Sequence, residues 1–142
     1  MKHWYNLSHK SQGLILLGLV WILFGWSVHA GVSASNVSGA WHTYWPAEPR
    51  AAMWYATGAY AMYAAVRRRH KNLALAFLVI MPAIRMSSFL TAWVVALIPG
   101  IPEGQPNGWY NAAFYLVMIL LVWYVATSPS PPVDRNLRTT EG

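Results

Sequence analysis

The sequence contains no cysteine and only four acidic residues in 142 positions. Without cysteine the chain has no disulfide bond, no thiolate nucleophile and no cysteine-ligated metal. Asp, Glu, Lys and Arg together make up only 10% of the residues, against about 25% in an ordinary soluble domain. Hydrophobic residues make up 56%, and so little charge cannot cover the surface of a water-soluble domain of this size. The composition therefore predicts an integral membrane protein.

Four apolar segments provide the expected membrane spans. A helix needs about 20 apolar residues to cross a ~30 Å hydrocarbon core, and each segment comes close to that length. The loop PGIPEGQPNG, dense in Pro and Gly, separates the last two segments. We therefore expect an all-α, four-span domain over residues 13–127, with a cytoplasmic segment before it and a disordered tail at 128–142. The expected spans are residues 13–30, 50–66, 73–98 and 109–127.

The first segment has an alternative interpretation as a secretory signal peptide, because Lys2 and Lys10 precede its apolar run. Its bulky Trp21 and Trp26, and the weak cleavage site after it, favour a membrane span instead.

The second segment is less hydrophobic and rich in small residues, so it could instead be an interfacial helix. Small side chains on one face let neighbouring helices approach closely in lipid, which favours a central span. The repeats that predict this packing are Ala52, Ala56, Tyr60 and Ala64, and Thr57, Ala61 and Ala65.

Basic residues predict the orientation of the spans. Eight lie in the two terminal segments and the short loop at 67–71, and only Arg50 lies on the opposite side. The positive-inside rule then places both termini in the cytoplasm, with the chain in the cytoplasmic (inner) membrane. The basic loop residues expected to contact anionic lipid headgroups are Arg67, Arg68, Arg69 and Lys71. This topology explains the positive charge without a nucleic-acid partner.

Arg85 lies in the third segment, near the middle of the bilayer and without a neighbouring charge. An arginine at this depth costs at least ~2.5–3.5 kcal/mol on insertion scales. Pro82 removes a backbone hydrogen bond and predicts a helix kink. Hydroxyl side chains follow on the same segment, and together with Arg85 they form a candidate polar intramembrane site or pore lining. These residues are Ser87, Ser88 and Thr91.

No acidic residue lies within a span to neutralise Arg85. The remaining partners are hydroxyl groups, carbonyl groups freed by Pro82, lipid phosphate, or water. Arg85 could thus face a hydrated interior, a pore or an anion-binding pocket. Alternatively, it caps freed carbonyls and serves assembly alone.

The loop between the first two segments contains the aromatic sequence WHTYWP. It could bind a sugar or a partner protein, or it could be a re-entrant aromatic cluster in the headgroup layer. The candidate residues are Trp41, His42, Tyr44 and Trp45.

No residue pattern indicates catalysis. Acidic pairs, a Ser–His–Asp arrangement and a phosphate loop are all missing from the sequence, and no histidines have ligand spacing. We therefore expect no enzyme activity, no catalytic residue, no metal and no cofactor.

The layout resembles small multi-span membrane proteins of actinobacteria and their phages, including the holins. The features that carry this resemblance are RRRH in a tight turn, PAIR in a span, PGIPEGQPNGW before the last span, and a Pro-rich basic tail. The resemblance implies oligomerisation to permeabilise a membrane during phage lysis.

Three functions stay open from the sequence. The first is a non-enzymatic accessory protein that remodels the membrane or binds a partner. The second is a holin-like oligomeric pore, and the third is a small channel or transporter subunit. Each implies association with further copies or with a membrane partner protein.

Overall fold

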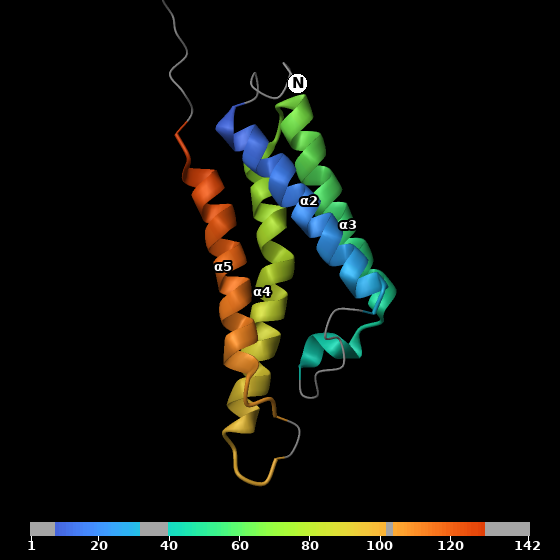
Figure 1. Cartoon of the computed structure of the whole chain (residues 1–142), viewed down its shortest axis with the longest axis vertical. Helices are drawn as coiled ribbons and strands as arrows, with labels where there is room; N and C mark the ends of the chain where they lie inside the picture. Colours follow the sequence, from blue (N-terminus) through green and yellow to red (C-terminus); the bar gives the residue numbers. More distant parts are fainter. Residues whose placement is uncertain (1–7, 32–39, 102–103, 130–142) are drawn as a thin grey trace, which may run out of the picture.

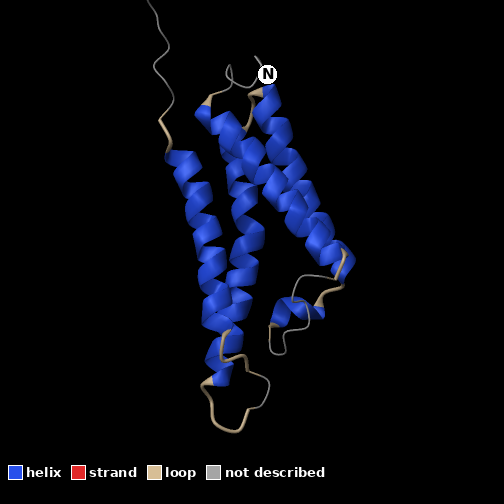
Figure 2. Ribbon diagram, viewed as in Figure 1, coloured by secondary structure: helices blue, strands red, loops and turns tan. Residues whose placement is uncertain are grey.

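The computed structural model describes residues 8–31, 40–101 and 104–129 of the chain. It confirms the all-α class, and the described residues contain no strand (Figure 2). Each expected span falls within one long helix or extends just past its end. The third expected span extends past its helix, because residues 97 and 98 lie in the turn that follows. The helices are α2 (His9–His29), η1 (Trp41–Tyr44, a 3-10 helix), α3 (Ala47–Arg67), α4 (Lys71–Ala96) and α5 (Gly108–Thr127). Most of the tail expected to be disordered lies outside the described residues.

Three of the long helices, α2, α4 and α5, are long and apolar enough to cross a membrane. Helix α3 has 21 residues, as many as α2, but its composition is less apolar. Its small residues lower its hydropathy because Ala and Gly contribute little apolar surface. The membrane crossing of α3 and the orientation of the termini therefore remain proposals.

The four long helices form two antiparallel pairs, α2 with α3 and α4 with α5 (Figure 1). The pairs meet at the end of the bundle that holds the α3–α4 turn, which we call the closed end. They diverge toward the end where α2 stops and α3 begins, which we call the open end. Figure 1 shows η1 in the gap between the diverging pairs. The site described below is built in this gap.

Gly18 of α2 and Gly58 of α3 bring the first pair into backbone contact. A Cβ atom added to either glycine would lie 2.7 Å from the carbonyl oxygen of the other. The predicted face through Ala52 and Ala56 is wrong, because both are exposed. The buried residues of α3 recur at alternating spacings of three and four, which keeps them on one side of the helix. They include Ala51, Trp54, Gly58, Ala61 and Ala65.

At the closed end, α3 and α4 are joined by a tight turn. Arg68 and His70 adopt left-handed backbone conformations there, with φ of 55° and 53°. Two lysines connect this end to the start of α2: Lys71 Nζ donates to Ser8 Oγ at 3.1 Å, and Lys10 Nζ donates to Asn72 Oδ1 at 3.3 Å. The start of α2 is thereby held against the start of α4.

Candidate functional site: the buried Arg85 cluster

Pro82 lies inside α4, and the helix continues through it from Lys71 to Ala96. Because proline has no N–H, the carbonyl oxygen of Leu78 loses its usual helical donor. The indole N–H of Trp21, on α2, donates to this oxygen at 3.1 Å. Arg85 therefore does not cap the carbonyl that Pro82 frees, which was one of the roles considered for it.

Arg85 is almost completely buried, with 2% of its surface exposed. Its Nη1 lies 2.9 Å from Nε2 of His42, which is 43 positions earlier in the chain. A guanidinium group can only donate hydrogen bonds, so Nε2 of His42 must be the acceptor. The partner of Arg85 is thus a neutral imidazole.

The other side of the His42 ring fixes its tautomer. Nδ1 lies 2.7 Å from Ser88 Oγ, and the backbone N–H of His42 donates to the same oxygen at 3.0 Å. Since Nε2 carries the lone pair, Nδ1 carries the proton and donates to Ser88. His42 therefore bridges two residues of α4 that lie almost one turn apart.

The helix η1 carries His42 into the bundle. Its first turn is stabilised by two bonds from Thr43 to the carbonyl oxygen of Ala40, from N at 2.9 Å and from Oγ1 at 2.7 Å. Ser88, which meets His42, precedes the last residue of α4 by eight positions, or ~12 Å along the axis. The loop before α3 thus folds back alongside α4 and does not stay beyond its end.

Burial shifts the ionisation of His42. Its pKa is lowered from 6.5 to about 3 by desolvation, which is the largest cause, and by the positive charges of Arg85 and Arg50. A protonated His42 would have no lone pair for Arg85 and would place a second cation against it. The geometry and the electrostatics therefore agree on a neutral ring.

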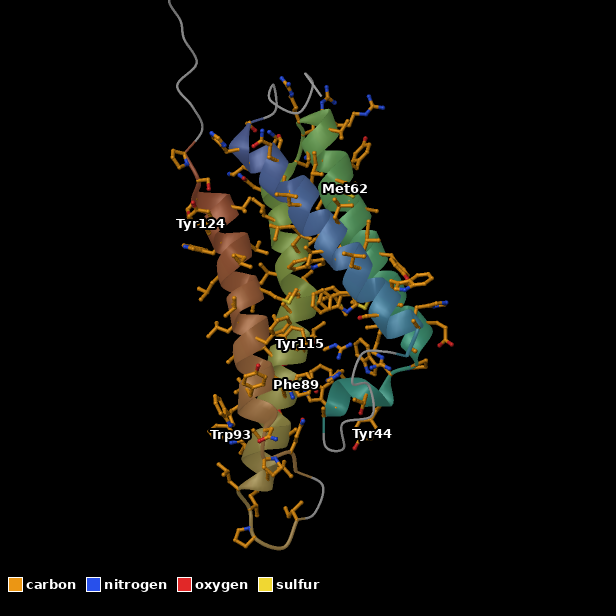
Figure 3. The ribbon with its side chains drawn as sticks, viewed as in Figure 1. Tyr44, Met62, Phe89, Trp93, Tyr115 and Tyr124 are labelled. Atoms are coloured by element: carbon orange, nitrogen blue, oxygen red, sulfur yellow. The ribbon has the colours of Figure 1, made fainter. Side chains whose placement is uncertain are left out.

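Aromatic rings enclose the cluster from the side of α4 and α5. The His42 ring lies 5.0 Å from the ring of Phe89, which stacks on Tyr115 at 5.8 Å with an interplanar angle of 11°. Figure 3 shows Phe89 and Tyr115 at the level of η1, where the helix pairs diverge. Because these rings are apolar, they lower the local dielectric constant and so strengthen the charge interactions within the cluster.

A second buried arginine, Arg50, lies at the start of α3 and is 5% exposed. Its Nε donates to the carbonyl oxygen of Pro46 at 3.2 Å. Three buried N–H donors on α3 and α4 have no hydrogen-bond partner among the described residues. They are Arg50 Nη1, Arg85 Nε and Trp54 Nε1.

The polar residues expected together on α4 are divided between two faces. At ~100° per residue, Ser88 lies ~60° around the helix from Arg85, whereas Ser87 lies ~160° away and Thr91 ~120° away. Ser88 is buried and joins the cluster, while Ser87 and Thr91 are exposed. The hydroxyls of Ser87 and Thr91 donate to carbonyl oxygens of their own helix, both at 2.9 Å.

The two loop sites lie at opposite ends of the molecule. In the turn at the closed end, Arg67, Arg68 and Arg69 are exposed and Lys71 is half-buried. In the aromatic loop, Trp41 and Trp45 pack edge to face at 6.1 Å, and Tyr44 is exposed. Of the four candidate residues of this loop, His42 is the one bonded to Arg85 and Ser88.

Sequence reasoning did not identify His42 as the partner of Arg85. The sequence presents His42 only as part of the aromatic loop, and the partners it suggests for Arg85 are hydroxyl groups, freed carbonyl groups, lipid phosphate and water. No local spacing links positions 42 and 85, so only the fold brings them together. Among the residues that the structure describes, no group of three His, Asp or Glu side chains is placed to bind a metal ion.

Comparisons with protein-family models, curated proteins and solved structures found no match for this chain. The chemistry of the site therefore rests on its own residues, and the resemblance to holins stays a prediction.

Proposed function

We propose that this chain is a non-enzymatic integral protein of the cytoplasmic membrane with an accessory role, in which it binds a membrane partner or remodels the bilayer. Both termini lie in the cytoplasm, and α3 crosses the membrane beside α2. In this orientation the exposed arginines of the turn at the closed end contact anionic headgroups of the inner leaflet.

The burial of Arg85 is the observation that carries this proposal. A residue that lines a hydrated pore exposes its charge to water, whereas the Arg85 guanidinium is bonded to His42 and enclosed by Phe89 and Tyr115. Opening a channel through a single copy would have to break the bond between Arg85 and His42 and separate the rings packed around it. A closed bundle supports an accessory role over that of a conduit.

The surface of α5 supports the binding of a partner. One face packs on α4, while large apolar side chains cover the rest of the helix. They include Phe114, Leu116, Val117, Leu120, Leu121 and Trp123. This surface is wide enough to meet both lipid and another membrane helix.

Inducible expression with a potential-sensitive dye tests the proposal. We expect normal growth and an intact membrane potential for the wild type and for Arg85→Leu. A photo-crosslinking residue at Leu120 of α5 should give a discrete product of higher mass, while the control position Leu23 of α2, which is more exposed, should not. Collapse of the potential on wild-type expression would contradict the accessory role.

A holin-like pore between several copies is the alternative, and one observation favours it. Ser87 and Thr91 lie on an exposed side of α4, where an oligomer would turn them toward a shared lumen. Under this alternative, replacing both by Leu abolishes leakage, while the neighbouring exposed control Leu90→Ala does not.

A further inference from the structure

We propose that Arg50, Arg85 and Trp54 form a binding site for a monoanion inside the bundle, between the two helix pairs. The ligand is a halide or a phosphate monoanion, and the phosphate could be free or belong to a lipid headgroup. This site is separate from the accessory role proposed above and does not depend on it.

The first reason is uncompensated charge. Arginine stays protonated in proteins, and both guanidinium groups are at least nine-tenths buried. Their protein acceptors are neutral: the carbonyl oxygen of Pro46 for Arg50 and the imidazole of His42 for Arg85. No carboxylate of the described residues pairs with either group. Two positive charges are therefore held in a low-dielectric environment without a negative one.

The second reason is the set of free donors. Arg50 Nη1, Arg85 Nε and Trp54 Nε1 are all buried without an acceptor. Each unsatisfied buried donor costs about 1–3 kcal/mol, and more when the donor is charged. A single anion accepts several N–H groups at once, so it can satisfy these donors and balance charge together.

The third reason is the placement of these donors. Arg50 and Trp54 are four residues apart, one turn along the same buried face of α3. Arg85 belongs to α4 on the other side of the gap, and η1 lies between the two pairs (Figure 1). The charge of Arg50 also contributes to the low pKa of His42, so it acts at the same place as that of Arg85.

The two side-chain acceptors bonded within the cluster are already in use. Nε2 of His42 accepts from Arg85, and Ser88 Oγ accepts from both the ring and the backbone of His42. Protonation of His42 would add a third positive charge and does not solve the imbalance. An anion from outside the protein would neutralise the cluster, which no carboxylate of the described residues does.

Thermal unfolding of the full chain in a neutral detergent tests the site. The melting temperature is measured in NaCl, NaBr and sodium phosphate against sodium gluconate at equal ionic strength, since gluconate is a bulky and weakly binding anion. We expect a saturable rise in the melting temperature with a small anion. Arg50→Gln should raise the half-saturating concentration about tenfold or more, equivalent to about 1.4 kcal/mol. The exposed control Arg67→Gln should leave it unchanged.

Trp54→Phe provides a second variant should Arg50→Gln fail to fold. It keeps an aromatic ring in the core but is smaller and lacks the N–H donor, so we expect several-fold weaker anion dependence. A parallel series in nanodiscs compares phosphatidylglycerol with digalactosyldiacylglycerol, a bilayer lipid that has no phosphate. A free anion stabilises the protein in detergent, whereas a lipid phosphate stabilises it only when phosphatidylglycerol is present. Equal melting temperatures in all salts and in both lipids would overturn the proposal.

Discussion

The indole N–H of Trp21 donates to the carbonyl oxygen of Leu78, the acceptor that Pro82 leaves without a helical donor. One side chain of α2 thus repairs the hydrogen bonding of α4 and connects the two helix pairs. Trp21 is 1% exposed and packs on Trp54 at 5.7 Å, so this bond is enclosed by other rings.

Trp21→Phe should lower the free energy of unfolding by about 1–3 kcal/mol, because it leaves the Leu78 carbonyl buried without a donor. The Phe ring retains much of the packing. The measurement is thermal or denaturant unfolding in detergent. The matched control is Trp26→Phe on the same helix, where the side chain is 63% exposed. Equal effects at the two positions would argue against the role of the Trp21 bond.

Gly58→Ala should destabilise the bundle by about 1–3 kcal/mol, because the new Cβ atom would lie 2.7 Å from the carbonyl oxygen of Gly18. A backbone atom cannot rotate away as a side chain can. Heat treatment followed by size-exclusion chromatography gives the stability. Ala59→Val adds bulk at the next, exposed position and should be tolerated. A Gly58→Ala variant as stable as the wild type would show that the helices are not in backbone contact there.

Stability should depend on pH through His42. Its folded pKa of about 3 lies below the 6.5 of the free side chain, so the unfolded chain binds the proton first as the pH falls. We expect this contribution to be constant above about pH 7 and to be lost between pH 6.5 and about 3, by up to ~1.4 kcal/mol per unit.

His42→Gln tests this pH dependence, because glutamine offers an acceptor to Arg85 but does not titrate. The difference in unfolding free energy between the wild type and His42→Gln should vary with pH in this window. His29→Gln is the control and should keep the wild-type profile. A pH profile for His42→Gln parallel to that of the wild type would contradict the assignment.

Single cysteines test whether α3 crosses the membrane, since the chain has none of its own. Tyr44 precedes α3 and Arg69 follows it, and both side chains are exposed. A membrane-impermeant maleimide added to intact cells should label Tyr44→Cys and not Arg69→Cys. Labelling of both cysteines in intact cells would place the two ends of α3 on one side of the membrane and favour an interfacial helix. Labelling of neither cysteine until the cells are opened would lead to the same conclusion.

Much of the fold could be predicted from the sequence. The apolar runs and the Pro- and Gly-rich loops located the helices, because helix length in lipid and turn chemistry are both local properties. The buried face of α3 was harder to predict, since small residues cover more than one side of it. The buried residues of α3 recur through Gly58 at spacings of three and four. A search for alanines at every fourth position does not find this pattern.

The candidate site could be predicted only in part. Arg85 was identified because an isolated charge in an apolar run is conspicuous, and Ser88 was included with its neighbours. His42 was not identified as its partner, because η1 enters the gap between diverging helix pairs. That divergence is a property of tertiary packing, and nothing in the local sequence around residue 42 encodes it.

The most direct test of the account is a double-mutant cycle on Arg85 and His42. Arg85→Leu removes the charge, and His42→Phe leaves the guanidinium buried without its acceptor, so His42→Phe should be strongly destabilising. Unfolding free energies of the wild type, both single variants and the double variant give the coupling. We predict a double variant more stable than His42→Phe alone and a coupling of at least ~1 kcal/mol. Effects that add within ~0.5 kcal/mol would show that Arg85 does not depend on His42.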